Sequence, residues 1–381
     1  MFAASKLEAD HRFSSSFVRR HPPSQPSPTR GEGARRPSWR VCAILAALLV
    51  PLLLAACAPR LQEIGPPVDQ PQLIENGPPK NALVTGALHL ADGADLPLRV
   101  WYPWDRPAEA VVLALHGFND YSKGFAAAGK GMARRGFIFY AYDQRGFGLA
   151  PERGIWAGET QMIDDLRVAA RLIKARHPDL PLFLLGESMG GAVVMTAAVS
   201  DDPPVADGLI LAAPAIWGWQ TLSPAAQKIT EGAAHFIPWV TVVPTGVHAQ
   251  ASSNRAALRD LARDPLVIKE TRIDTAYGLV NLMTDAFDAA AKLDKPRWLL
   301  LFGEREGILD RSAVNQALPH FRDLPPEQGR IAIYPRGYHL LLRDFNQYAV
   351  YDDMAAWMRD PAAPLPSGAD KRGEDKSINE D

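Results

Sequence analysis

A serine enclosed by glycines is the feature of this sequence with the clearest chemical potential. Residues 186–190 read GESMG, a GxSxG pattern placed between the apolar run 182–185 and the helix-like run 192–199. In that setting the pattern forms a nucleophile elbow, a tight strand-to-helix turn that strains the serine backbone and leaves room only for glycine beside it. The sequence therefore predicts that Ser188 is a nucleophile.

A serine hydroxyl needs a base within hydrogen-bond reach and a carboxylate that orients this base. In chains with such an elbow the order is serine, acid, histidine. His339 follows the strand-like residues 331–333 in a loop, so we predict that it is the base. The other histidines lie before the elbow, in a long middle insertion or at a helix end: His11, His21, His89, His116, His177, His235, His248 and His320.

The acid is expected in the loop after the strand-like run 298–302. Glu306 lies three residues after the strand-ending Gly303, where this arrangement usually carries its acid. Asp310 is the alternative, because a longer loop would deliver it to the histidine. Asp310 also fits the N-cap of a helix over 311–318. We favour Glu306 and keep Asp310 open.

Two backbone amides are needed to bind the oxyanion that forms when a serine attacks a carbonyl group. Met189, directly after the nucleophile, supplies the first amide. The apolar strand 111–115 runs into His116, Gly117 and Phe118, so the amide of Phe118 is the expected second donor. We predict that His116 braces this loop by hydrogen bonds.

Three segments resemble the monoacylglycerol lipase and lysophospholipase group of α/β-hydrolases: HGFNDYS at 116–122, YDQRGFG at 142–148 and GESMGG at 186–191. The segment 252–267 is similar, more weakly, to the family's cap segment that ends in Asp-Pro-Leu. With its connecting strands the resemblance covers most of the chain from Leu98 to His339.

The resemblance implies a triad of Ser188, Glu306 and His339 and an oxyanion hole formed by the amides of Phe118 and Met189. The family's acid is usually aspartate, so Glu306 is a departure from its pattern.

The glycine-rich segment 142–148 lacks the GKS or GKT ending of a P-loop. We therefore expect a structural turn in which Asp143 pairs with Arg145 below the active site.

Strand-like and helix-like runs alternate over the 280 residues from Asn81 to Asp360. This alternation predicts the α/β class, an α/β-hydrolase fold with a mostly parallel sheet and helices on both faces. Runs at 83–90 and 98–101 predict an antiparallel hairpin at the edge. We place the core at 81–214 and 296–360.

An insertion at 215–295 is expected to form a helical cap, because about eighty residues separate two strands that a short connection could join. It carries many large apolar residues, among them Trp217, Trp219, Trp239 and Met283. These side chains either pack on the core or form an acyl-chain pocket and lipid-contacting face.

The N-terminus resembles the signal of a bacterial lipoprotein. Three arginines precede the apolar run 41–54, which ends in Leu-Ala-Ala-Cys at Cys57. We predict that 1–56 is an extension and signal peptide, that Cys57 is lipidated, and that the protein resides in the bacterial cell envelope, facing the periplasm or exterior. A conventional secretory signal or an uncleaved helix is the alternative. Residues 57–80 are expected to be a proline-rich tether and 361–381 a disordered tail.

Charge and composition exclude other classes of function. Loss of 1–56 removes eight basic and three acidic side chains, so the formal charge falls by five, from −2 to −7. An acidic domain is a poor binder of nucleic acid. No HExxH or clustered Cys and His pattern occurs, so we expect no metal and no cofactor. The two cysteines, Cys42 in the signal and Cys57, leave none for an internal disulfide.

The sequence as a whole predicts a serine hydrolase that cleaves carboxylic esters of lipid-like substrates, such as monoacylglycerols or lysophospholipids, through an acyl-enzyme. An aminopeptidase or small-ester esterase on the same triad is the alternative, since a triad does not fix the leaving group. A non-catalytic binding module is the third interpretation.

Overall fold

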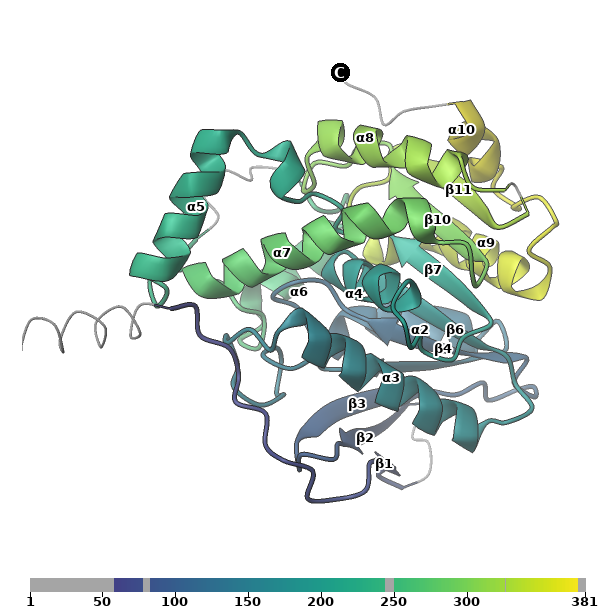
Figure 1. Cartoon of the computed structure of the whole chain (residues 1–381). Helices are drawn as coiled ribbons and strands as arrows, with labels where there is room; N and C mark the ends of the chain where they lie inside the picture. Colours follow the sequence, from purple (N-terminus) through teal and green to yellow (C-terminus); the bar gives the residue numbers. More distant parts are fainter. Residues whose placement is uncertain (1–57, 78–82, 244–249, 326, 376–381) are drawn as a thin grey trace, which may run out of the picture. The chain divides into compact units, whose positions relative to one another are not determined.

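A central β-sheet organises the protein. The computed structural model describes residues 58–77, 83–243, 250–325 and 327–375. In these residues a nine-stranded sheet has the order β1-β2-β3-β5-β4-β6-β7-β10-β11 (Figure 1). The strands are β1 (Gln72–Glu75), β2 (Leu83–His89), β3 (Asp95–Trp101), β4 (Ala110–Leu115), β5 (Phe137–Tyr142), β6 (Leu182–Glu187), β7 (Gly208–Ala212), β10 (Trp298–Gly303) and β11 (Gly329–Tyr334). From β5 to β11 all pairings are parallel.

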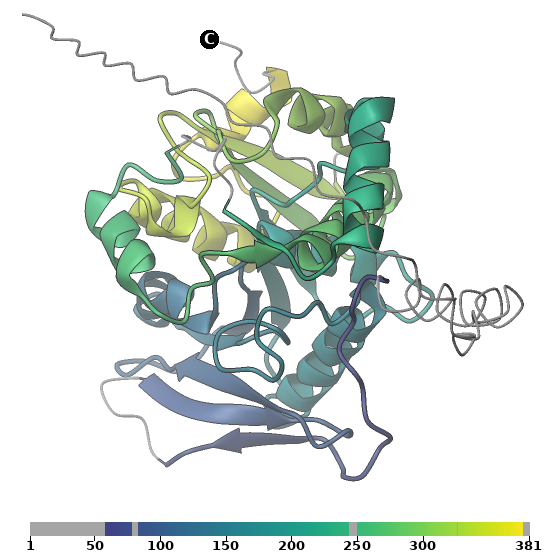
Figure 2. The same cartoon turned by 90° about the vertical axis from the view of Figure 1, so that its left-hand side faces the viewer.

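The inner strands are buried along their whole length, because helices cover both faces of the sheet. Alternate residues of β4 face two separate hydrophobic cores. One core contains residues of α3 (Glu159–Arg176), α4 (Met189–Ala198), α7 (Ile273–Ala289) and α8 (Arg311–Arg322). The other contains residues of α2 (Ala126–Ala133), α9 (Gln347–Arg359) and α10 (Ala369–Asp375) (Figure 2). The predicted α/β class and α/β-hydrolase architecture are confirmed.

The predicted antiparallel hairpin is β2 and β3, which pair from Leu83 with Trp101 to His89 with Asp95. It is not the edge of the sheet, because β1 pairs antiparallel with the outer side of β2. The carboxylate of Glu75 in β1 accepts hydrogen bonds from the hydroxyls of Tyr102 and Tyr140, at 2.8 and 2.9 Å.

The N-terminal side of β1 also lies on the domain. Leu61 forms a parallel bridge with Trp156, and the amide of Gln62 donates to the Trp156 carbonyl at 2.9 Å. The prediction of a tether over 57–80 is therefore wrong for residues 60–75. Backbone hydrogen bonds of Gln62, Val68 and Asp69 and the pairing of β1 with β2 hold this segment on the domain, although residues 63–70 are exposed.

The C-terminal segment 361–375 is ordered against β11, so the prediction of a disordered tail over 361–381 is wrong for this part. Leu365 and Ala369 are buried, and the Asp370 carboxylate accepts a hydrogen bond from Arg330 at 3.0 Å. A few apolar residues in a polar, proline-containing stretch were sufficient to dock it. Residues 376–381 lie outside the described part of the chain.

The predicted insertion between β7 and β10 holds η2 (Trp219–Thr221), α5 (Pro224–Phe236), β8 (Thr241–Val242), α6 (Arg255–Arg263), β9 (Thr271–Arg272), α7 and η3 (Ala290–Lys292). Ser223 and Asn254 cap the N-termini of α5 and α6 with their side chains. Both of these helices are largely exposed, whereas α7 packs along α4 through buried residues such as Leu282 and Ala286. The boundary predicted at 215–295 therefore encloses a helix that belongs to the core layer.

The predicted signal peptide and the lipidation site Cys57 lie outside the described residues. Within the described ranges, no helix combines the length and the apolar character needed to cross a bilayer.

Candidate active site

Ser188 occupies a strained turn between β6 and α4. Its φ and ψ angles are 55° and −118°, a conformation that costs free energy for any residue with a side chain. The turn is held by hydrogen bonds from the amide of Ser188 to Ala212 and from the amide of Ala215 to Ser188, both at 3.0 Å. A Cβ atom added to Gly190 would lie 2.1 Å from the Leu115 carbonyl oxygen. The geometry is that of the predicted nucleophile elbow.

Glu306 and His339 meet at the carboxyl edge of the sheet. Glu306 follows β10, His339 follows β11, and the imidazole Nδ1 lies 2.8 Å from Glu306 Oε2. Both side chains are buried. The other carboxylate oxygen, Oε1, accepts three backbone hydrogen bonds from Gly307, Ile308 and Leu309, at 2.8, 2.7 and 3.0 Å. Glu306 is therefore fixed by its own loop and presents one oxygen to the histidine.

Opposite charge outweighs burial for both members of this pair. Burial alone would raise the pKa of Glu306, but the adjacent His339 and the loop amides lower it below its ordinary value. Burial alone would lower the pKa of His339, but the Glu306 carboxylate raises it above 6.5. The pair thus favours an imidazolium beside a carboxylate, the state that a general base reaches after it has taken a proton.

Asp310, the alternative acid, begins α8. Its carboxylate accepts a hydrogen bond from the amide of Ala313 at 2.9 Å, as an N-cap does. The structure thus brings Glu306 to the histidine and leaves Asp310 at the helix terminus. The catalytic roles of Ser188, Glu306 and His339 stay predictions.

The loop after β4 crosses directly over the nucleophile. A Cβ atom added to Gly117 would lie 3.2 Å from Ser188 Cβ. Phe118, the predicted oxyanion residue, is half-buried and its ring packs against Phe147, with centroids 5.6 Å apart. Met189 is the first residue of α4, so its amide has no acceptor within the helix. Met189 thus follows the serine in the chain, and the loop that carries Phe118 contacts the serine through Gly117; the oxyanion role of both amides stays a prediction.

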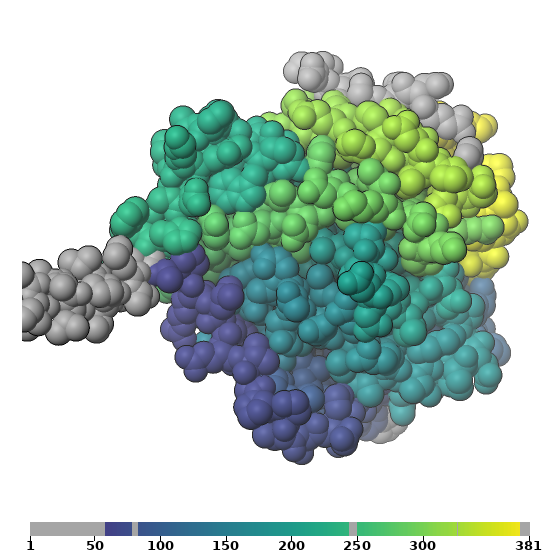
Figure 3. Space-filling view, in the orientation of Figure 1, coloured from purple at the N-terminus to yellow at the C-terminus, as the bar shows by residue number. Residues whose placement is uncertain are grey.

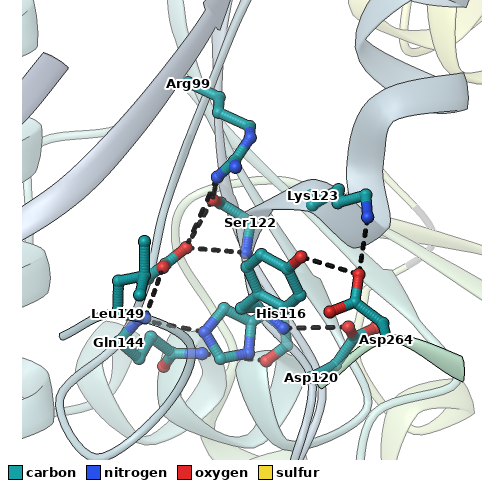
Figure 4. A network of polar contacts seen from close by, with 10 residues as sticks. Arg99, His116, Asp120, Ser122, Lys123, Gln144, Leu149 and Asp264 are labelled. Carbon is teal, nitrogen blue, oxygen red and sulfur yellow. Dashed lines mark hydrogen bonds and ion pairs between the residues drawn. The ribbon is translucent and has the colours of Figure 1, made fainter. Parts of the chain in front are cut away.

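Residues 116–121, the loop after β4 that carries Phe118, are called the oxyanion loop below. His116 braces this loop by hydrogen bonds, as predicted. Its Nε2 accepts a hydrogen bond from the amide of Gln144 at 3.0 Å, and its Nδ1 lies 2.9 Å from the Gly117 carbonyl oxygen (Figure 4). Burial lowers the pKa of His116, which keeps the imidazole neutral with one nitrogen donating and one accepting.

Asp143 also supports this loop, and its predicted pairing with Arg145 is wrong. The Asp143 carboxylate accepts hydrogen bonds from the amides of Ser122 and Leu149, each at 3.0 Å (Figure 4). Arg145 instead pairs with Asp165 of α3, at 2.7 Å. The turn separates the two side chains, since one faces the oxyanion loop and the other faces a helix.

A buried cluster of charges was missed by the sequence reasoning. Arg343, four residues after His339, donates from Nη2 to Asp120 at 2.5 Å and to Glu187 at 2.7 Å. All three charged side chains are buried. Asp120 belongs to the oxyanion loop and Glu187 to the elbow, so this cluster joins the three loops of the site. The residues are too far apart in sequence for spacing to reveal them.

The cap segment holds the oxyanion loop from outside. The Asp264 carboxylate accepts hydrogen bonds from the Tyr121 hydroxyl at 2.8 Å and the Lys123 ammonium at 2.5 Å (Figure 4). Burial would raise the pKa of Asp264, but Lys123 and its other donors lower it to about 2. Farther along, Asn119 donates to the Thr271 hydroxyl at 2.7 Å. The segment 252–267, which resembles the family's cap segment, thus contacts the loop that carries Phe118 through Asp264.

Across the residues that the structure describes, no group of three or more His, Cys, Asp or Glu side chains is placed to hold a metal ion.

Residues 106–346, which contain the elbow, the oxyanion loop and the Glu306–His339 pair, match the family described as serine aminopeptidase, S33. The chain belongs to this family. The match spans more than half of the 381 residues and ends shortly after the histidine loop. The fold, the strained turn at Ser188 and the family match together identify this S33 family member as a serine hydrolase.

Relatives support the resemblance to monoacylglycerol lipases. The chain is 24% identical to a monoacylglycerol lipase of Mycolicibacterium smegmatis over 271 residues, which cover 68% of this chain and 91% of that protein. It is also 24% identical to the monoglyceride lipase of Homo sapiens, covering 70% and 88% of the two chains. The crystal structure of a soluble variant of monoglyceride lipase from Saccharomyces cerevisiae superposes with a TM-score of 0.60 at 22% identity, covering 79% and 98%.

Proposed function

We propose that this S33 family member hydrolyses carboxylic esters of lipid-like substrates, such as monoacylglycerols or lysophospholipids, through an acyl-enzyme. The observation that carries the proposal is the strained Ser188 elbow at the same sheet edge as a buried His339 held 2.8 Å from Glu306. Relatives named monoacylglycerol or monoglyceride lipase favour an ester of a fatty acid over other acyl groups.

In the proposed reaction His339 takes the proton of the Ser188 hydroxyl while the serine oxygen attacks the ester carbonyl carbon. The amides of Phe118 and Met189 bind the resulting oxyanion. The imidazolium then gives its proton to the departing alcohol, and the acyl group remains on Ser188. Water attacks this ester with His339 again as base, and the fatty acid leaves as the serine hydroxyl is restored.

The cap supports an apolar acyl group. Trp219 and Tyr277 lie with ring centroids 5.5 Å apart between η2 and α7, and Trp156 packs against Phe118 at 6.5 Å. An aromatic contact therefore runs from the oxyanion residue toward the buried face of α7, where a Cβ atom on Gly278 would meet Trp156. We infer that aromatic side chains placed this close to Phe118 favour an apolar acyl chain over a charged peptide terminus.

We also propose that Cys57 is lipidated after removal of residues 1–56, which would anchor the enzyme in the bacterial cell envelope facing the periplasm or exterior. The support is the sequence alone, an Ala-Ala-Cys tripeptide after an apolar run that arginines precede.

Labelling with a fluorophosphonate probe tests the chemistry of the site. The wild-type chain should react, Ser188→Ala should not, and Ser312→Ala, at an exposed serine of α8, should react like the wild type. An unlabelled, folded wild-type chain would contradict the proposed nucleophile.

A substrate panel then tests the leaving group and the acyl preference. Monoacylglycerols from butyryl to oleoyl are compared with aminoacyl p-nitroanilides at equal enzyme concentration. We expect kcat/KM to rise with acyl length and the anilides to be inert. Faster anilide cleavage would support the aminopeptidase alternative instead.

A further inference from the structure

The cap carries an exposed apolar surface outside the active site. This cap surface consists of seven exposed side chains in α5, in β8 and in the residues that flank β8: Ile229, Phe236, Ile237, Trp239, Val240, Val242 and Val243. Phe236 and Trp239 keep 65% and 54% of their surface exposed. Large apolar side chains gathered in this way usually mark a contact with a partner or a membrane.

The cap surface is attached firmly to the start of α7. β8 pairs antiparallel with β9, and the amide of Ile273 donates to the Val240 carbonyl at 2.9 Å. The next amide, of Asp274, donates to the Pro238 carbonyl at 3.2 Å. Whatever holds Asp274 therefore also fixes the position of Trp239.

The N-terminal segment reaches the domain at this same point. The amide of Arg60 donates to the buried Asp274 carboxylate at 3.2 Å, and its guanidinium pairs with Glu152 at 3.0 Å. Gln62 is buried and donates from its side chain to the carbonyls of Pro151 and Ile155, at 3.3 and 2.9 Å. Figures 1 and 3 show the purple N-terminal segment against the ends of α5 and α7.

The distance from anchor to cap is therefore short. Cys57 precedes Arg60 by three residues, and three residues of extended chain span at most about 10 Å. A tether of twenty free residues would let the domain take any orientation relative to the membrane. This short connection restricts the orientation of the domain. A bilayer that holds an acyl group on Cys57 must lie close to Asp274 and thus to the cap surface.

We propose that the cap surface inserts into the same lipid bilayer that holds the acylated Cys57, and that the docked segment 60–62 sets this orientation. The partner is a phospholipid membrane, which takes up indole, phenyl and branched aliphatic side chains at its interface. One anchor and one apolar surface together bind a membrane far more stably than either does alone. The enzyme would then work with its cap against the layer in which lipid esters are found.

This inference rests on the lipidation of Cys57 in the proposed function. The test therefore measures contact with the membrane independently of catalysis. The full chain is purified from membranes as Trp239→Cys, labelled there with an environment-sensitive dye, and reconstituted in phosphatidylethanolamine and phosphatidylglycerol vesicles that carry a spin-labelled lipid. The matched control places the dye by Asp201→Cys, in an exposed loop after α4. Each variant is also prepared with Ser188→Ala.

Quenching should be several-fold stronger at position 239 than at position 201, and Ser188→Ala should leave both values unchanged. Insertion of about twelve Gly and Ser residues between Ala58 and Pro59 should lower the quenching at 239, because the longer connection reduces the effective concentration of the surface at the bilayer. Hydrolysis of a soluble butyryl ester should not change on insertion.

Equal quenching at positions 239 and 201 would contradict insertion of the cap surface into the bilayer. Quenching at position 239 that is unchanged by the insertion would contradict the role of segment 60–62. Mass spectrometry of the N-terminus reports acylation separately, and an unmodified Cys57 would overturn the short connection as well. Failure of ester hydrolysis with intact quenching at 239 would count against the proposed function alone.

Discussion

Glu306 divides its two carboxylate oxygens between its own loop and His339. Oε1 accepts three backbone amides, and Oε2 lies 2.8 Å from the imidazole Nδ1. An aspartate in this place would be one methylene shorter and could not reach both partners without a shift of the loop. The departure from the family's usual acid is thus accommodated by the loop that follows β10.

Replacement of the acid should separate Glu306 from Asp310. Glu306→Gln removes the charge that stabilises the imidazolium, so turnover should fall roughly 10³- to 10⁴-fold. Asp310→Asn is the matched control, because asparagine caps a helix as well as aspartate, and should change turnover by less than about twofold. Steady-state kinetics with a soluble ester measure both. The opposite ranking would transfer the acid role to Asp310.

The pH dependence of activity should follow the raised pKa of His339. Only the neutral imidazole acts as base, so kcat/KM should rise with pH along a limb whose midpoint lies above 6.5. In Glu306→Gln burial acts without the opposing carboxylate, and the limb should move to lower pH. The His339 share of the pair's stabilisation is fully present below pH 6.5 and is lost as pH rises through the raised pKa, whereas the Glu306 share is fully present above pH 4.5 and is lost as pH falls through the lowered pKa. A midpoint at or below 6.5 in the wild type would contradict the assignment.

Two glycine substitutions should have opposite effects on stability. Gly190→Ala forces a Cβ to 2.1 Å from the Leu115 carbonyl oxygen, so the elbow must shift and both folding and activity should suffer. Gly232→Ala, inside α5 with no atom within 4 Å of the new Cβ, should stabilise the chain by about 1 kcal/mol. Urea unfolding measures both, and a neutral Gly190→Ala would argue against the close packing of the elbow on β4.

The buried charge cluster should be costly to break. Arg343→Met leaves Asp120 and Glu187 buried without their cation, and the free energy of unfolding should fall by about 3–5 kcal/mol. Adding Asp120→Asn and Glu187→Gln to the same chain removes the unpaired charges and should restore part of the loss. Urea unfolding at neutral pH compares the three chains. A cluster that contributes only geometry would give an equal loss in both variants.

The terminal segments should contribute to stability, contrary to the tether and tail that the sequence predicts. A chain of residues 81–360 lacks β1 and the buried Leu365, so it should be less stable than residues 58–375 by at least about 2 kcal/mol. Leu365→Ala in the longer chain is the matched test of the C-terminal share. Identical unfolding midpoints for 58–375 and 81–360 would mean that these contacts add nothing measurable.

The sequence by itself predicted a serine hydrolase, the class that the family match also shows. Three patterns depend on local spacing: GxSxG after an apolar strand, a histidine after the last strand, and apolar runs that alternate with helices. The strands and helices of the structure begin and end within a few residues of these patterns. The Glu306 position followed from its distance to a strand end. Local patterns of this kind are readable because backbone geometry repeats every two or 3.6 residues.

Only the tertiary structure decided which polar groups meet. It brought Glu306 and not Asp310 to His339, separated Asp143 from Arg145, and joined Arg343 to Asp120 and Glu187 across more than a hundred residues of chain. It also docked the N-terminal segment on Asp274. Charge and hydrogen-bond partners are chosen by proximity in space, and the packing of the sheet and its helices sets that proximity without leaving a spacing signal in the sequence.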